Sequence, residues 1–102
     1  LHCFSMPERL RECAERGYAM SFAGQVTYPT ADDLRAAVRD APEAALLIET
    51  DSPYLAPVPR RGRPNRPAYV AHTLRAIAAE RGVSEERLDE LTTANAARVF
   101  GW

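Results

Sequence analysis

The sequence contains no lysine, and all 13 of its basic side chains are arginines. Together with 14 acidic side chains they give a net charge of -1, which excludes a general attraction to nucleic acid or to membranes but allows a local basic patch. No apolar stretch reaches the roughly 18 residues of a transmembrane helix. The chain also does not open with the basic and apolar segments of a signal peptide. These absences predict no membrane partner.

Cysteine is scarce as well. Cys3 and Cys13 are the only two, and their spacing is not Cys-x-x-Cys, so the sequence predicts neither a zinc framework nor a disulfide scaffold. Two buried, reduced thiols in a cytoplasmic protein are the simpler interpretation. The 102 residues suffice for one domain. The first residue is leucine rather than methionine, and we therefore expect the chain to begin inside a longer one.

Short apolar segments alternate with amphipathic segments along the first half of the chain. Strands are expected at residues 1–4, 18–22 and 44–49, and helices at 5–17 and about 30–41. Helices of this length can connect parallel strands, so the predicted fold class is α/β with parallel βα repeats. The run at 44–49 is almost entirely apolar, which is typical of a strand that is covered on both faces.

Helix boundaries are indicated by local capping patterns. Ser5 with Glu8, and Thr30 with Asp33, have the spacing of capping residues, and Ser84 is expected to cap the last helix. A helix is predicted at 68–81, where a glycine follows. The inward side chains expected in the last helix are Leu88, Leu91, Ala94 and Val99.

Polar side chains mark the ends of the first and third predicted strands. His2 lies at the first end, and Glu49 and Asp51 lie at the third. Functional residues gather at the carboxyl ends of parallel strands, where an imidazole and a carboxylate can hold a divalent metal or share a proton. The alternatives are a buried histidine at position 2 and a turn-forming aspartate before Ser52-Pro53. Glu49 can face the same way as Asp51 or orient a ligand.

A stiff loop rich in proline and arginine follows at 57–67. Its arginines are Arg60, Arg61, Arg63 and Arg66. Forked guanidinium groups suit phosphate, so the loop is either a phosphate-binding segment or simply a solvated one. Tyr54 could stack on a nucleobase, although burial against the last helices is the stronger expectation. Asn95, among small residues of the last helix, is expected to bond to backbone.

Seven short segments of the sequence form a specific pattern through their residues, their order and their spacing. They are "HCFS" at 2–5, "SFAGQVTY" at 21–28, "ETDSPYLAP" at 49–57, "RG" at 61–62, "N" at 65, "PAYV" at 67–70 and "TTANAARVFG" at 92–101. Together they resemble the C-terminal part of the TatD-type metal-dependent hydrolases, the TatD DNase family. The resemblance covers essentially the whole chain and treats residues 1–102 as a single partial domain.

The resemblance implies that the chain is the last three strands and helices of a TIM-like (β/α)8 barrel. It further implies a site for two divalent metal ions, with magnesium, manganese and zinc equally possible. In that family pattern His2 and Asp51 match metal ligands, Asp51 also matches the proton acceptor beside the attacking water, and Glu49 plays a supporting part. The other ligands of the family, an early His-x-His pair, a glutamate and a further histidine, would all precede residue 1.

The activity implied by the resemblance is hydrolysis of phosphodiester bonds in single-stranded DNA from a 3′ end. Because His2 and Asp51 alone are too few ligands, we expect the isolated chain to be inactive without the missing N-terminal part of the barrel. One alternative is a hydrolase of another ester or amide, such as D-aminoacyl-tRNA. Another is a non-catalytic fragment that binds nucleic acid or docks on a partner.

Overall fold

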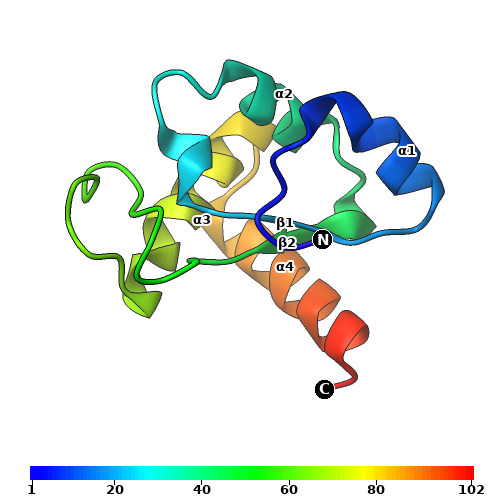
Figure 1. Cartoon of the computed structure of the whole chain (residues 1–102). Helices are drawn as coiled ribbons and strands as arrows, with labels where there is room; N and C mark the ends of the chain where they lie inside the picture. The colour runs from blue at the N-terminus through cyan, green and yellow to red at the C-terminus, as the bar shows by residue number, and fades with distance from the viewer.

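A parallel pair of short strands lies at the centre of the computed structural model, which describes residues 1–102 (Figure 1). Strand β1 is Met20–Phe22 and strand β2 is Leu46–Ile48, with Met20 opposite Leu46. One further backbone hydrogen bond, from Glu49 N to Phe22 O at 3.0 Å, continues the pairing beyond β2. The predicted parallel βα arrangement is confirmed.

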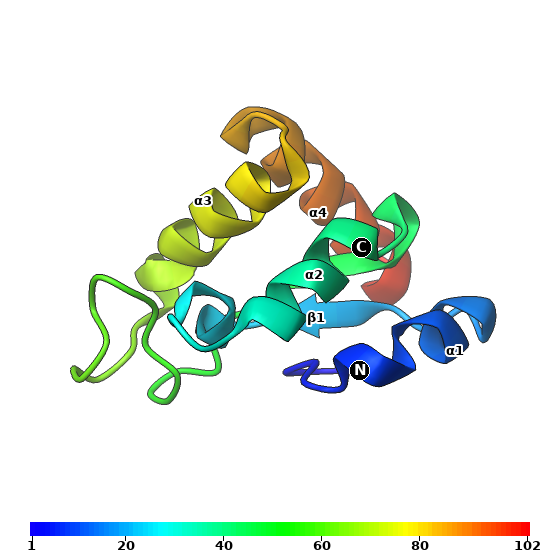
Figure 2. The ribbon, with the colours of Figure 1, turned by 90° about the horizontal axis from the view of Figure 1, so that it is seen from above.

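Four α-helices surround the strands (Figures 1 and 2). They are α1 (Leu10–Glu15), α2 (Asp32–Asp40), α3 (Val70–Arg81) and α4 (Glu85–Phe100). Short 3-10 turns complete the connections at Pro7–Arg9, Gly24–Thr27, Glu43–Ala45 and Pro67–Tyr69. Helix α3 packs against both α2 and α4, and α4 also packs on β2. The sheet thereby acquires its helical cover.

The two faces of the sheet differ in their cover. Met20, Phe22 and Leu46 are fully buried against the helices in the main core. Side chains alternate along a strand, so Ser21, Leu47 and Glu49 point the other way, and they line a mainly apolar groove of about 580 Å³. Leu46 on the first face is fully buried and Leu47 on the second is only 8% exposed, so the expectation that the strand within 44–49 is covered on both faces is confirmed for the middle of β2.

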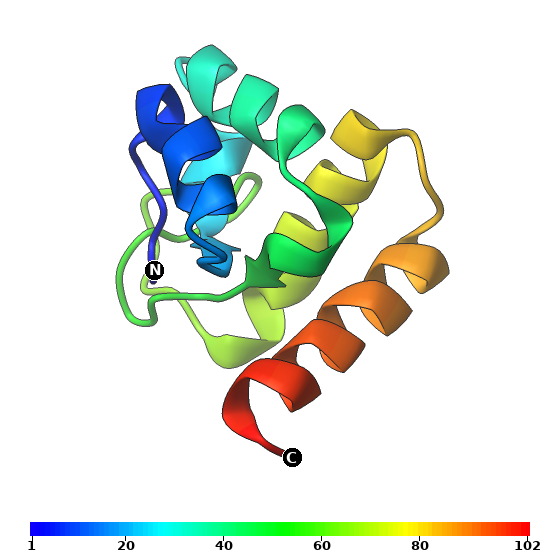
Figure 3. The ribbon, with the colours of Figure 1, turned by 90° about the vertical axis from the view of Figure 1, so that its right-hand side faces the viewer.

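Residues 1–4 lie beside β1 in space without forming a regular strand (Figure 3). Ser21 N donates to Leu1 O at 2.9 Å, and Phe4 N donates to Ser21 O at 2.8 Å. In a regular parallel ladder, the two residues that bond to the N–H and the C=O of the same residue are separated by one residue. Here the two partners of Ser21, Leu1 and Phe4, are separated by two residues, so the N-terminal segment contains one extra residue. Cys3 takes up the extra length with a positive φ of 46°. The first predicted strand, at residues 1–4, is thus a bulged edge segment rather than a strand.

Two of the three expected helix caps are wrong. The Pro7–Arg9 turn has Met6, not Ser5, at its N-cap, with no side-chain hydrogen bond. Helix α2 begins after Ala31, and Arg35 binds the carbonyls of Val26 and Tyr28 at its entrance, where the Thr30 cap was expected. The guanidinium donates to carbonyls that precede the helix and does not substitute for a cap, so the first N–H groups of α2 have no side-chain acceptor. The cap at Ser84 is confirmed, because its hydroxyl accepts from Arg87 N at 3.0 Å.

The inward face of α4 was predicted only in part. Leu88 is fully buried and Leu91 packs against the core, as expected. Ala94 and Val99 are exposed. Their expected place is taken by Thr92 and Asn95, which are buried. Polar side chains can occupy this face because their hydrogen-bonding groups are satisfied by backbone carbonyls.

Candidate metal centre

Three side chains converge where the N-terminal segment meets the end of β2. His2, Glu49 and Asp51 each offer a ligand atom, and these atoms all lie within 4.8 Å of one another. Asp51 and Glu49 directly follow β2, while the bulged segment beside β1 carries His2 to the same edge. The structure therefore brings together the histidine and both carboxylates that the sequence singled out.

The donor set fits a divalent cation. One imidazole and two carboxylates are ligands found at catalytic zinc and related metal centres, which typically use about three protein ligands and leave a position open. The His2 side chain is 80% exposed and that of Glu49 is 20% exposed, so the cluster opens to solution on the histidine side. These features allow a cation to enter and a water molecule to share it.

Glu49 is in direct contact with His2. Its Oε1 lies 3.2 Å from His2 Nδ1, the geometry in which a carboxylate orients a metal-binding imidazole. Glu49 was expected to support a ligand, and this contact is compatible with that role. Its carboxylate also belongs to the same compact cluster as Asp51, so it is close enough to act as a ligand itself.

The Cys3 thiol lies within the electrostatic field of this cluster. Burial raises the pKa of the Cys3 thiol, and the negative charges of Asp51 and Glu49 raise it further. The ligand atoms of the compact group come from His2, Glu49 and Asp51, and the Cys3 sulfur is not among them.

The loop after Asp51 folds back over the 3-10 turn that follows β1. Gly24 lies so close to it that a Cβ atom would be 2.2 Å from Leu55 O, which excludes any larger residue. Val58 N donates to Thr27 Oγ1 at 2.8 Å, and Tyr28 donates from its hydroxyl to Ala56 O at 3.0 Å. These contacts give the loop a fixed path beside the cluster.

Two of the four arginines of this loop lie over aromatic rings of the protein. The guanidinium carbon of Arg61 is 4.0 Å from the ring centroid of Tyr28, and that of Arg60 is 5.6 Å from Tyr69. Arg63 and Arg66 are exposed. None of the four forms an ion pair. A guanidinium stacked on a ring keeps its N–H edge free, so Arg61 is held in place while its donors remain available.

Tyr54 is exposed, contrary to the expectation that it is buried against the last helices. It is 71% exposed. Its backbone N donates to Asp51 O at 2.8 Å, which closes a tight turn between the two residues. Helices α3 and α4 pack on the sheet instead. The ring of Tyr54 is therefore exposed to solvent, and in the sequence it follows shortly after Asp51.

Sequence reasoning missed Asn65. It is only 5% exposed, although the surrounding loop residues are exposed. Its side chain holds the two ends of the Asp51 turn. Asn65 is one of the residues on which the family resemblance rests, but no role was assigned to it; as a single amide within a loop of arginines and prolines it also favours bonding to nearby backbone.

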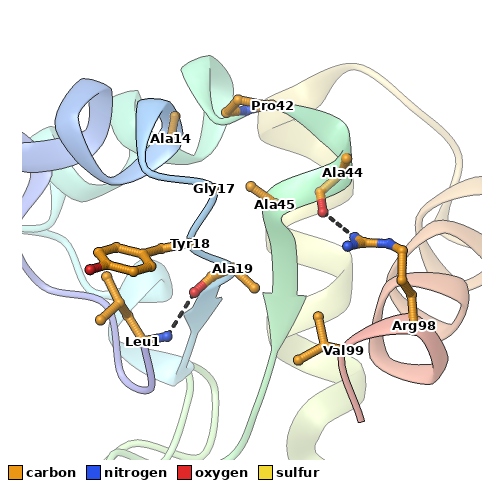
Figure 4. Close-up of a pocket in the computed structure, with 10 residues that line it drawn as sticks. All are labelled: Leu1, Ala14, Gly17, Tyr18, Ala19, Pro42, Ala44, Ala45, Arg98 and Val99. Atoms are coloured by element: carbon orange, nitrogen blue, oxygen red, sulfur yellow. Dashed lines mark hydrogen bonds between the residues drawn. The ribbon is translucent and has the colours of Figure 1, made fainter. Parts of the chain in front are cut away.

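The opposite ends of the strands carry no comparable cluster. A pocket of about 470 Å³ lies there, lined mainly by small and apolar residues (Figure 4). Its polar contacts are structural: the N-terminal amine donates to Ala19 O, and Arg98 donates to Ala44 O. No carboxylate or imidazole lines this pocket.

None of the helices has the length and apolar character to cross a membrane.

Comparison with known sequences identifies relatives over nearly the whole chain. Residues 1–101 match the family model described as "TatD related DNase". The "uncharacterized metal-dependent hydrolase YcfH" of Escherichia coli is 46% identical over 101 residues, covering 98% of this chain and 38% of the relative. The "3'-5' ssDNA/RNA exonuclease TatD" of Citrobacter rodentium is 40% identical, covering 99% of this chain and 41% of that protein. The chain thus spans about two fifths of the length of these curated relatives.

Solved structures agree with this result. The E. coli TatD homologue YjjV matches with a TM-score of 0.86 at 28% identity, covering 95% of this chain and 38% of that one. A TatD-family hydrolase of Entamoeba histolytica matches with a TM-score of 0.80 at 16% identity, covering 95% and 40%. These neighbours are TatD hydrolases with the TIM-barrel fold, and the chain has the fold of part of such a barrel.

Proposed function

The chain belongs to the family of TatD-related DNases, which are metal-dependent hydrolases, and we propose that it carries one side of an active site that hydrolyses phosphodiester bonds in single-stranded DNA from the 3′ end. The observation that carries the proposal is the grouping of His2, Glu49 and Asp51 within 4.8 Å. The name of the Citrobacter relative, a 3'-5' exonuclease of single-stranded DNA and RNA, supports the substrate class.

Each residue of the cluster has a distinct part in this proposal. His2 and Asp51 hold a divalent cation, and Glu49 fixes the orientation of the His2 ring through their 3.2 Å contact. A bound cation, one of two in a complete site, supplies the positive charge that makes water acidic and stabilises charge on phosphate oxygens. Asp51 accepts the proton of the attacking water.

The adjoining loop supplies contacts to the nucleic acid. Arg61 is oriented by Tyr28 with its N–H groups free, and exposed Arg63 and half-buried Arg60 lie next to it in the chain. Forked donors of this kind bind phosphate in two-point contacts. The exposed ring of Tyr54 offers a surface on which a base can stack. Phosphate and base contacts would therefore both lie on the loop that follows Asp51.

The site requires a further part of the barrel. Three ligands are too few for two metal ions, each of which needs about three protein ligands of its own or shared. The groove lined by Ser21, Leu47 and Glu49 is open and mainly apolar, and the sheet has no further strand beyond β2. We propose that the remaining strands of the barrel cover this face.

The two unpaired cysteines suit a reducing compartment such as the cytoplasm.

Fragment complementation tests this proposal. A single-stranded oligonucleotide with a fluorescent 3′ end is incubated with residues 1–102 alone, and with a chimera that adds the part of the E. coli relative that this chain does not cover. Turnover at background by the chain alone and chelator-sensitive turnover by the chimera are expected. Robust turnover by the chain alone would contradict the need for more ligands. Preferential hydrolysis of a D-aminoacyl-tRNA by the chimera would replace the proposed substrate.

A further inference from the structure

Asn65 is a buried amide in an otherwise exposed loop. Its Nδ2 donates to Thr50 O at 2.6 Å and to Tyr54 O at 2.7 Å. Its Oδ1 accepts from Arg66 N at 2.9 Å, and its own backbone N donates to Pro53 O at 3.0 Å. Both side-chain N–H groups and the side-chain oxygen are thus in use. Asn65 thus donates hydrogen bonds to three carbonyl groups of a single turn.

The turn that Asn65 holds is the one that contains Asp51. Thr50 precedes Asp51 and Tyr54 closes the turn on it, so the carbonyls bound by Nδ2 lie on either side of the carboxylate-bearing residue. Asp51 has a positive φ of 58°, a conformation that non-glycine residues adopt only rarely. Such a conformation persists when the surrounding contacts enforce it. Within the turn, Tyr54 N donates to Asp51 O, and from outside the turn the Asn65 side chain binds the carbonyls at both of its ends.

We infer that Asn65 is a positioning residue for the metal ligand Asp51: it fixes the backbone turn that aims the Asp51 carboxylate at His2 and Glu49. The inference rests on the proposed cation site. An amide is required at this position because only a planar group with two N–H donors can bind both carbonyls at once. Aspartate would place an acceptor against two other acceptors, and alanine would leave the carbonyls of Thr50 and Tyr54 without their amide donor.

Asn95 provides a matched control within the same chain. It is 6% exposed, and its Nδ2 also donates to two backbone carbonyls, Glu43 O at 2.7 Å and Leu46 O at 2.9 Å. These carbonyls lie at the start of β2, whereas the metal-ligand cluster lies at its end. Replacing either asparagine by alanine removes the same chemistry from an equally buried place. Only the replacement of Asn65 should disturb the cluster.

The test compares Asn65→Ala and Asn95→Ala in the 102-residue chain, with manganese alone as the probe. Paramagnetic broadening of the NMR signals of His2 and Glu49 gives the dissociation constant for Mn²⁺ even when binding is weak. We expect Asn65→Ala to raise it at least about tenfold, the equivalent of one ordinary hydrogen bond. Asn95→Ala should leave it unchanged. Hydrogen exchange at the Tyr54 amide, which closes the turn, should accelerate about tenfold in Asn65→Ala only.

Each outcome decides a different point. Equal dissociation constants in both variants, or an unchanged Tyr54 amide in Asn65→Ala, would overturn the positioning role and leave the proposed function intact. Absence of Mn²⁺ binding in the unsubstituted chain would overturn the cation site and the inference with it. If Asn65→Ala does not fold, Asn65→Ser is compared with Asn95→Ser. Serine retains one donor, so a smaller but still selective loss of Mn²⁺ affinity is then expected.

Discussion

The two ends of β2 are built with the same anchoring chemistry but differ in what the anchor holds. At the start of the strand, the Asn95 amide binds the carbonyls of Glu43 and Leu46. At its end, the Asn65 amide binds the carbonyls of Thr50 and Tyr54. The first anchor joins a helix to the sheet. The second binds a turn that carries the Asp51 carboxylate, so the same kind of amide contact is used for packing at one end and, in the proposed function, beside the metal ligands at the other.

The largest effect should come from Asp51, the carboxylate that belongs to the metal-ligand cluster. In the chimera with the E. coli relative, Asp51→Asn should lower turnover at least about a hundredfold, because it removes a cation ligand and a proton acceptor. Glu43→Gln is the control at the other end, since Glu43 is exposed and forms only a 3.5 Å surface contact with Arg87. Initial rates on the 3′-labelled oligonucleotide provide the measurement. Unchanged turnover in Asp51→Asn would remove Asp51 from the mechanism.

A cation bound at the end of β2 should stabilise the folded chain. At a Mn²⁺ concentration about 100 times the dissociation constant, the free energy of unfolding of the 102-residue chain should rise by about 2.7 kcal/mol, since the cation binds the folded state. His2→Ala should abolish this gain. His72→Ala, in α3, should retain it. Thermal unfolding with and without chelator measures both, and an equal gain in the two variants would place the bound cation elsewhere.

The anchor at the start of β2 should contribute stability alone. Asn95→Ala leaves two carbonyls of the Glu43–Leu46 segment without their amide donor, which should lower the free energy of unfolding by about 1–3 kcal/mol. Urea unfolding of the 102-residue chain measures this loss. An unchanged midpoint would mean that water replaces the amide at no cost, and the parallel drawn between the two anchors would then fail.

The smallest expected effect concerns the exposed tyrosines. Tyr54 follows the end of β2 and is 71% exposed, whereas Tyr18 precedes β1 and is 45% exposed. Tyr54→Ala should weaken binding of single-stranded DNA to the chimera by about 1 kcal/mol through the loss of one base stack. Tyr18→Ala should not weaken it. Fluorescence anisotropy at constant salt distinguishes them, and equal losses in both variants would exclude a specific stacking role for Tyr54.

Predictions from local pattern succeeded where a short segment decides the structure. The serine cap of α4 and the turn at Gly82 were read correctly, because each depends on neighbouring residues only. The prediction that Asn95 bonds to backbone is also confirmed. A buried amide among small side chains has few partners other than carbonyls. The placement of His2, Glu49 and Asp51 at strand ends followed from the parallel pairing of the strands.

Local pattern failed where contacts outside the immediate segment decide the structure. The cap expected at Thr30 is absent, and the entrance of α2 is held by Arg35, which donates to the carbonyls of Val26 and Tyr28. Tyr54 was expected to meet the last helices, but these helices pack on the sheet. The importance of Asn65 was not visible, because the carbonyls it binds lie 11 and 15 positions earlier in the chain.

The sequence by itself determined the order of the elements and the residue types at the strand ends, because periodicity, capping and proline act over a few neighbouring positions. Only the tertiary structure decided which of those groups meet. The contact between His2 and Glu49 spans 47 positions and depends on a bulge at Cys3. The turn that carries Asp51 is bound by the amide of Asn65, whose carbonyl partners lie 11 and 15 positions earlier in the same loop. Both are set by long-range packing and hydrogen bonding, which no local pattern encodes.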